Sequence, residues 1–213
     1  MTRLTIQKII SRQLGHPRGL GGLITSGLMA AGNKQMYSYV LEASEGLTGS
    51  RLLEIGFGGG KHIRDIFSKT EVETMAGIDI SDSMVRTARR KNQIYIKNNK
   101  LVLLEGNSSE MPFKSSEFDS VLSLNTMYFW ENPLEDLEQI LYVLKPGGRF
   151  LLAINSKEVM LRNAYRDKYF NFYSKDEVET LLDKSGFKNI THSYEKLKIE
   201  DCHLFISQKE NIL

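Results

Sequence analysis

Short apolar runs alternate with longer amphipathic segments along most of this sequence. Five runs are predicted as buried strands, because each has strand length and polar or turn-forming residues around it: 52–55, 74–80, 100–107, 117–125 and 150–154. The segments between them place apolar residues three or four positions apart, which predicts amphipathic helices. This alternation of strand and helix predicts an α/β fold built on a parallel sheet.

Capping residues mark two of the predicted helices. Ser81 is a suitable N-cap for a helix that we expect to run to about Asn98. Asn132 precedes a second helix, which has Pro133 at its first position. That helix is predicted to end at the string Leu-Lys-Pro-Gly-Gly (144–148), because proline stops a helix and the glycines allow an abrupt return to the sheet.

The C-terminal part departs from simple alternation. Five aromatic residues crowd into 165–173, where they could wall a substrate pocket or pack inward, and the sequence leaves both interpretations open. Ser174 is then predicted to cap a helix that stops at Gly186. Two closing strands, around 187–194 and 203–207, are predicted to form an antiparallel pair.

The segment before the first strand is predicted to be helical. Residues 2–46 carry three amphipathic stretches joined by glycine-rich hinges, and Asn33 is the predicted cap of the third. One face of that third helix is apolar: Met36, Tyr37, Val40 and Leu41. The three helices could form a lid that closes over a ligand, or a fixed layer on the sheet.

A glycine-rich turn follows the first predicted strand. Gly56, Gly58 and Gly60 stand at alternate positions after Glu54, and helical spacing resumes directly afterwards. A strand, a glycine turn and a helix N-terminus together bind the polar part of a nucleotide-like ligand, because glycines allow close approach to free backbone N–H groups. The dinucleotide fingerprint would require a third glycine at position 61, which is Lys61.

Asp79 ends the second predicted strand, about 20 residues beyond the glycine turn. An acidic side chain at that place can accept hydrogen bonds from both ribose hydroxyls of a nucleoside. An NAD-dependent enzyme would need the same acid, so Asp79 predicts nucleoside binding and does not choose between cofactors.

The combined motifs resemble those of class I S-adenosylmethionine-dependent methyltransferases, in particular the small-molecule enzymes of the type 11 group. The resemblance rests on the Glu-x-Gly-x-Gly-x-Gly spacing, on Asp79, on Phe118-Asp119 before an apolar run, and on the string at 144–148. It covers residues 52 to about 154. It implies a Rossmann-like, doubly wound, mostly parallel seven-stranded sheet with an antiparallel C-terminal strand pair and an N-terminal helical extension.

The resemblance also implies S-adenosylmethionine as the cofactor and assigns roles to residues of this chain. The methionyl and loop contacts fall to Glu54, Gly56, Gly58 and Gly60, the ribose to Asp79 with Ile80 beside it, the adenine to Asn107 and Ser108, and the surroundings of the sulfonium to Asn125 and Tyr128. Asn107 departs from the family pattern, in which an acidic residue is usual, but its amide oxygen can still accept from an exocyclic amine.

Methyl transfer from a sulfonium is a one-step displacement in which positioning and the exclusion of water can do most of the work. The sequence shows no catalytic triad. The four histidines are scattered without metal-ligand spacing, so no metal is predicted. If a base assists an O–H or N–H acceptor, Tyr128, His16 and Tyr37 are weak candidates, since each is expected near the mouth of the site.

Composition and charge limit the classes of partner that we expect. The formal net charge of +2 gives no electrostatic argument for nucleic acid, and the basic residues between Arg86 and Lys100 are interpreted as a solvated face, so a small molecule with an O, N or C acceptor is the predicted substrate. Cys202 is the single cysteine, which excludes an intramolecular disulfide. No apolar run suits a signal peptide or a membrane span, and we expect a cytoplasmic protein that does not bind membranes. The oligomeric state is not indicated.

Two other functions stay open at this point. One is a protein that binds S-adenosylmethionine without transferring the methyl group, as a sensor or partner-binding protein. The other is an NAD(P)-dependent oxidoreductase, against which the glycine spacing argues. For the methyltransferase that the motifs resemble, the chain is expected to divide into a helical lid or extension (1–46) and an S-adenosylmethionine-binding methyltransferase domain (47–213).

Overall fold

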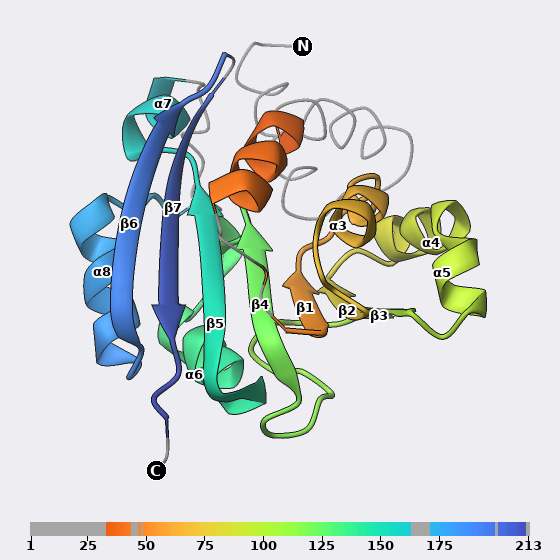
Figure 1. Ribbon diagram of the computed structural model, residues 1–213. Helices are drawn as coiled ribbons and strands as arrows, with labels where there is room; N and C mark the ends of the chain where they lie inside the picture. The colour runs from red at the N-terminus through yellow and green to blue at the C-terminus, as the bar shows by residue number, and fades with distance from the viewer. Residues whose placement is uncertain (1–32, 44–46, 48, 163–170, 199, 212–213) are drawn as a thin grey trace.

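The computed structural model describes residues 33–43, 47, 49–162, 171–198 and 200–211. A single sheet of seven strands runs through this part of the chain (Figure 1). The strands are β1 (Arg51–Ile55), β2 (Thr74–Asp79), β3 (Leu101–Glu105), β4 (Phe118–Leu124), β5 (Leu144–Ile154), β6 (Lys188–Lys196) and β7 (Asp201–Gln208). The labelled helices are α3 (Ile63–Lys69), α4 (Asp82–Lys91), α5 (Gln93–Lys97), η1 (Met127–Phe129), α6 (Pro133–Val143), α7 (Lys157–Arg162) and α8 (Lys175–Lys184). Residues 33–43 are also helical and are drawn in orange in Figure 1.

The strand order is β3-β2-β1-β4-β5-β7-β6. The first five strands in the chain pair in parallel, whereas β7 is antiparallel to both β5 and β6. This confirms the predicted Rossmann-like sheet and its antiparallel C-terminal pair. The order reverses between β1 and β4, and a ligand of such a sheet binds outside the carboxyl ends of the strands at that switch.

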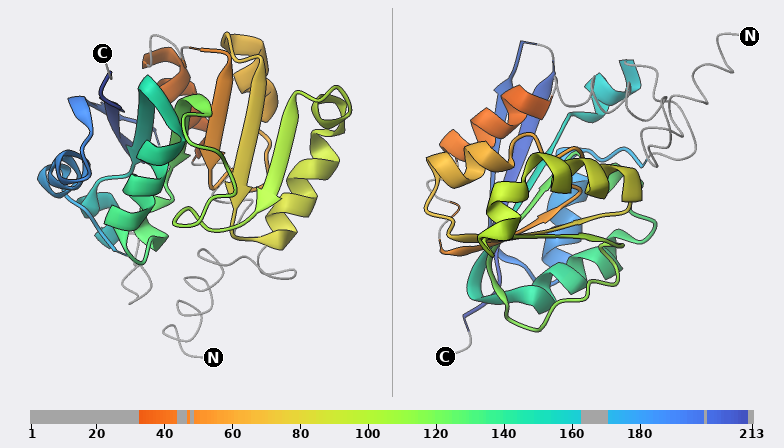
Figure 2. Two further views of the ribbon diagram at one scale, coloured as in Figure 1. Left: turned by 90° about the horizontal axis from the view of Figure 1, so that it is seen from below. Right: turned by 90° about the vertical axis from the view of Figure 1, so that its right-hand side faces the viewer.

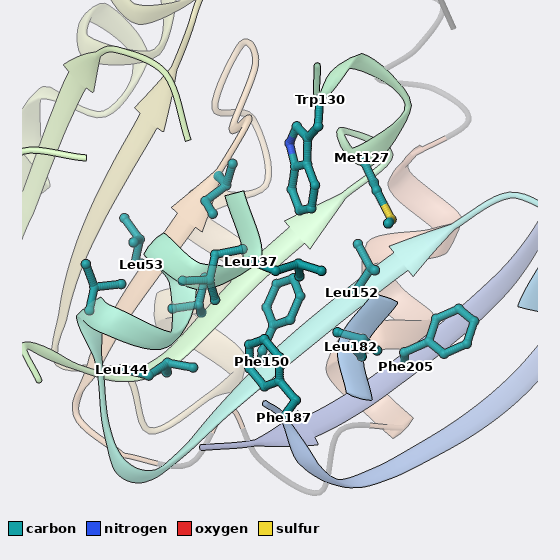
Figure 3. Close-up of a cluster of buried hydrophobic side chains, with 14 of the residues drawn as sticks. Leu53, Met127, Trp130, Leu137, Leu144, Phe150, Leu152, Leu182, Phe187 and Phe205 are labelled. Atoms are coloured by element: carbon teal, nitrogen blue, oxygen red, sulfur yellow. The ribbon is translucent and has the colours of Figure 1, made fainter. Parts of the chain in front are cut away.

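Helices cover both faces of the sheet, as the two views in Figure 2 show. Each face therefore carries a core of its own. On one face α6 and α8 pack over alternate strand residues, including Leu53, Phe150 and Phe205 (Figure 3). On the other face, helix 33–43, α3 and α4 pack over the intervening residues, such as Leu52. Burial on both faces explains why the central strands are continuous apolar runs in the sequence.

The helix predicted from Ser81 to Asn98 is two helices, α4 and α5, so that part of the prediction is wrong. The break falls at Asn92, which is buried. Its side-chain amide donates to the carbonyls of Ala88 (2.9 Å) and Gly60 (2.8 Å). An asparagine that bonds backbone groups in this way competes with the continuing helix.

The fifth strand begins earlier than predicted. β5 starts at Leu144, which pairs with Phe118, and the next pair joins Arg149 to Ser120. Between these pairs β4 advances by two residues (118 to 120) and β5 by five (144 to 149), so the Pro-Gly-Gly segment is an irregularity within the ladder. Gly147 supplies its left-handed backbone, with φ of 73°.

The C-terminal elements follow the prediction more closely. Ser174 caps α8 in a capping box with Glu177, and β6 and β7 form the expected antiparallel pair. Of the aromatic segment, Phe172 and Tyr173 are described, and both pack against the α6–α8 core. The first two predicted N-terminal helices, His16 and residues 163–170 lie outside the described residues. None of the helices that the structure describes is both long and apolar enough to cross a membrane.

Candidate cofactor and active site

A cavity of about 1110 Å³ opens at the carboxyl ends of the central parallel strands. Its lining includes all the glycines of the predicted turn, six of the other predicted site residues, and part of helix 33–43. The predicted site residues that line it are Gly56, Gly58, Gly60, Tyr37, Asp79, Ile80, Asn107, Ser108 and Asn125. The cavity therefore lies where the switch in strand order predicts a ligand.

The three positions of the turn require glycine for different structural reasons. All have positive φ: 74° at Gly56, 53° at Gly58 and 62° at Gly60. A Cβ on Gly56 would lie 2.1 Å from Thr126 Cγ2, and one on Gly60 would lie 2.7 Å from Ala88 Cβ. A Cβ on Gly58 would meet no atom within 4 Å, because that position faces the open cavity. Gly56 and Gly60 thus serve packing, while Gly58 leaves space for a ligand.

Helix α4 fixes the turn from the other side. Asn92 donates to the carbonyl of Gly60, and the Lys91 ammonium donates to the carbonyl of Gly59 at 3.2 Å. These two bonds keep carbonyl groups turned toward α4. Neither contact could be predicted from the sequence, because Lys91 and Asn92 lie more than 30 positions from the turn.

Asp79 stands at the tip of β2 and faces this turn. One carboxylate oxygen accepts from the N–H of Gly58 (2.7 Å) and the other from the N–H of Ser81 (2.9 Å). Burial raises the pKa of Asp79 to about 6, although the two N–H groups act in the opposite direction. The carboxylate can also accept from ligand hydroxyls, because each oxygen has a further lone pair.

Glu54 is fully buried and does not line the cavity. The Tyr37 hydroxyl donates to one of its carboxylate oxygens, and His62 Nε2 lies 2.8 Å from the carboxylate. The rings of Tyr37 and His62 are stacked, with centroids 3.8 Å apart and planes 11° apart. Tyr37 and His62 both line the cavity, whereas the carboxylate that they bind does not. The sequence placed Glu54 in the site and missed His62, whose position directly after the glycine turn was the available signal.

Ser108 and Asn107 follow β3 at another part of the wall. Asn107 is exposed, and its side-chain oxygen accepts weakly from the N–H of Ser109 at 3.4 Å. The Ser108 hydroxyl donates to Asp136, a buried residue of α6. Burial raises the pKa of Asp136 to about 6. Asp136 was not anticipated, since it lies within a helix whose sequence predicted only an apolar stripe.

Asn125 ends β4 with a left-handed backbone, φ 56°, and its side chain is buried at the cavity wall. Its oxygen accepts from the Tyr128 hydroxyl and from the N–H of Asn155, each at 3.2 Å. Its amide nitrogen donates to the Asn33 side chain at 2.9 Å. Asn125 therefore joins β4, β5 and helix 33–43.

The two described base candidates are both buried tyrosines. Burial raises the pKa of Tyr37 and of Tyr128 well above 10. The Tyr128 hydroxyl lies behind Asn125, does not line the cavity, and is also within 3.1 Å of the carbonyl of Asn155. Within the described residues no group of three or more His, Cys, Asp or Glu side chains could hold a metal ion.

These features fit a nucleoside cofactor. An acceptor carboxylate stands at the strand tip, free space lies over Gly58, and the backbone of the turn approaches the cavity without side chains. The serine and asparagine after β3 can bond a heterocyclic base, because their side chains and N–H groups include both donors and acceptors.

Comparison with known proteins gives the family. A family profile described as "Methyltransferase domain" matches residues 53–152. A protein of Methanocaldococcus jannaschii, "Uncharacterized protein MJ1123", is 31% identical over 167 residues, which are 74% of this chain and 75% of that protein. The chain belongs to the class I S-adenosylmethionine-dependent methyltransferases. "Uncharacterized methyltransferase YdaC" of Bacillus subtilis is 25% identical over 178 residues, 84% of this methyltransferase and 93% of the relative.

A solved structure agrees in fold. The methyltransferase of a Haloferax volcanii complex with the Trm112 methyltransferase activator superposes with a TM-score of 0.74 at 19% identity, covering 87% of this chain and 94% of that one. S-adenosylmethionine is the cofactor of this methyltransferase, as predicted.

Proposed function

We propose that this methyltransferase acts on a small molecule with an O, N or C acceptor atom. The volume of the cavity carries the proposal. At about 1110 Å³ it exceeds the roughly 300–1,000 Å³ usual for a small-ligand pocket, so an acceptor can lie beside the cofactor within one cavity. A formal net charge of +2 is consistent with this proposal, because it gives no electrostatic argument for nucleic acid as a partner.

The cofactor contacts that we propose follow the geometry of the wall. Gly58 leaves the space for the cofactor, Asp79 accepts from the ribose hydroxyls, and Asn107 with Ser108 bonds the adenine. Ile80 lies beside Asp79 and is half exposed, so it can cover one face of the nucleoside. Gly56 and Gly60 act indirectly, since each permits close packing of the turn.

The acceptor end of the cavity is assigned to the exit of β4. Asn125, Phe129 and Trp130 line it there. Tyr128 supports Asn125 from behind, so its role is positioning rather than contact with the reacting atoms. The cofactor supplies an activated methyl group, and the residues of the chain hold the acceptor in line with it and exclude water. No general base is assigned, because the pKa of each described tyrosine candidate lies well above 10.

The division at residue 46 is also part of the proposal: an N-terminal extension (1–46) and the cofactor-binding domain (47–213). Within the extension, helix 33–43 favours the fixed layer over the moving lid, since Met36 and Val40 are fully buried. A cytoplasmic location is proposed from the sequence alone.

Methyl transfer from S-adenosylmethionine labelled in its methyl group tests the substrate class. The full-length protein is incubated with panels of hydroxylated compounds, amines and carbon nucleophiles, and in parallel with total tRNA and a protein extract. Label in a small-molecule product supports the proposal. Label found solely in RNA or protein would refute the small-molecule acceptor, and turnover of any kind would exclude a non-catalytic sensor.

A further inference from the structure

The buried Glu54 carboxylate is bound by two stacked rings that line the cavity. Its side chain has no exposed surface, and its described partners are the Tyr37 hydroxyl and His62 Nε2. Neither partner needs to carry a charge, and no described lysine or arginine pairs with Glu54. A buried carboxylate is costly unless hydrogen bonds and a nearby positive charge compensate it.

His62 contacts both this carboxylate and the cavity. Its ring lines the cavity, with Nε2 bound to the carboxylate and one face stacked on Tyr37. An ionised carboxylate only accepts hydrogen bonds, so Nε2 carries the hydrogen and, in the neutral ring, Nδ1 is the acceptor. No described residue binds Nδ1.

We propose that His62 binds the α-ammonium group of the cofactor through Nδ1, and that Glu54 and Tyr37 position the imidazole for this contact. The inference rests on the proposed cofactor placement. It changes the role of Glu54, which the resemblance assigns to the methionyl and loop contacts, because that carboxylate is fully buried and does not line the cavity.

Electrostatics favours a cation at this place. The Glu54 carboxylate accepts from His62 Nε2 and so fixes the tautomer in which Nδ1 is the acceptor, as a carboxylate does for a metal-binding histidine. The α-ammonium then supplies the positive charge that the described surroundings of Glu54 lack. Stacking on Tyr37 fixes the plane of the ring, so Nδ1 keeps one direction.

Helix 33–43 holds Tyr37 in position by separate contacts. The Tyr39 hydroxyl donates to Ser193 of β6 at 2.8 Å, and the Gln35 side chain accepts from the N–H of Lys198 at 3.2 Å. These bonds attach the helix to the sheet without touching Glu54. Tyr39→Phe is therefore a matched control for Tyr37→Phe, because each substitution removes one hydroxyl from the same helix.

The test compares two ligands in calorimetric titrations of the full-length protein. S-adenosylhomocysteine carries the amino-acid end, and 5′-methylthioadenosine shares its nucleoside and sulfur but lacks that end. His62→Ala is expected to weaken S-adenosylhomocysteine binding about tenfold or more, the scale of a hydrogen bond to a charged group, and to change 5′-methylthioadenosine binding less than about twofold.

The positioning residues give a second readout. Glu54→Gln keeps the size of the side chain but can donate to His62 Nε2, which would move the imidazole hydrogen to Nδ1. This variant and Tyr37→Phe are expected to lose affinity selectively for S-adenosylhomocysteine, whereas Tyr39→Phe keeps the wild-type ratio of the two affinities. If Tyr39→Phe changes the ratio as much as Tyr37→Phe, docking of the helix explains the effect and the positioning role is refuted.

Two results separate this inference from the proposed function. Suppose that wild-type protein binds S-adenosylhomocysteine and transfers methyl groups to a small molecule. If His62→Ala then lowers the affinity for both ligands equally, or for neither, the proposed role of His62 is refuted and the proposed function stands. If folded wild-type protein binds neither ligand, the cofactor placement and the inference fall together.

Discussion

The protonation of individual buried carboxylates is expected to make ligand affinity and stability depend on pH. Asp79 has a pKa of about 6, so it is ionised at neutral pH and accepts from the ribose hydroxyls in that form. Protonation removes acceptor capacity, and the affinity for S-adenosylhomocysteine is therefore expected to fall about tenfold between pH 7.5 and pH 5. Titration calorimetry at several pH values measures this. Asp79→Asn should bind more weakly and with a smaller pH dependence than the wild type, and a flat wild-type profile would contradict the assignment.

Asp136 has the same raised pKa but a different consequence. In the unfolded chain its pKa is near 3.8, so the folded state disfavours its ionised form. The cost is fully present above pH 6, at most about 3 kcal/mol, and it vanishes below about pH 4. Asp136→Asn still accepts the Ser108 hydroxyl and is expected to stabilise the protein against urea at pH 7.5, with a smaller difference at pH 4.5. A variant less stable at both pH values would show that the hydrogen bond outweighs the ionisation cost.

The sequence predicted several residues that line the cavity but few of their contacts. Asp79 and the glycines were found because their spacing reflects a local chain path. The two hydrogen-bond partners of Glu54 lie 17 positions before it and eight after it, and Asp136, which accepts from Ser108, lies 28 positions after that serine. Contacts between elements depend on packing, which spacing along one chain does not encode.

Among the elements, the glycine turn allows effects on cofactor affinity to be distinguished from effects on the stability of the fold. Gly58→Ala adds a Cβ in open space, so the expected loss of stability is about 1–2 kcal/mol, from the positive φ alone. Its Cβ intrudes on the cofactor space, and we expect a clear loss of S-adenosylhomocysteine affinity. Gly60→Ala places a Cβ against Ala88 and should destabilise the fold more strongly. Urea unfolding and titration of both variants test this, and equal stability losses would contradict the different roles of the two positions.

Helix 33–43 behaves as part of the core in this structure. Met36 is fully buried, so Met36→Ala is expected to lower the free energy of unfolding by about 2–5 kcal/mol in a single cooperative transition. Glu42→Ala, at an exposed position of the same helix, is the control and should have little effect. An unchanged urea midpoint for Met36→Ala would mean that the helix detaches before the domain unfolds, as a lid would.

Element types were predictable where caps and apolar periodicity agree, as in α6 and α8. The prediction was wrong where one side chain serves a distant element. Asn92 ends α4 because its amide reaches the glycine turn, and β5 begins before its glycines because Leu144 already pairs with Phe118. Local propensity contains neither fact.

For the whole molecule, the alternation of strands and helices predicted a parallel α/β sheet, but the strand order came from the resemblance to a family. The order with its switch between β1 and β4 brings the glycine turn, Asp79 and Asn125 to one edge. Once that order is known, the position of the cavity follows from the general rule for open parallel sheets.

Calorimetric titration of the full-length protein with S-adenosylhomocysteine, with NADH in a parallel titration, tests the central claim that this cavity binds the methyl donor. We predict one-site binding of S-adenosylhomocysteine in the micromolar range and no binding of NADH. An absence of S-adenosylhomocysteine binding by protein that unfolds cooperatively in urea, or tighter binding of NADH, would contradict the account.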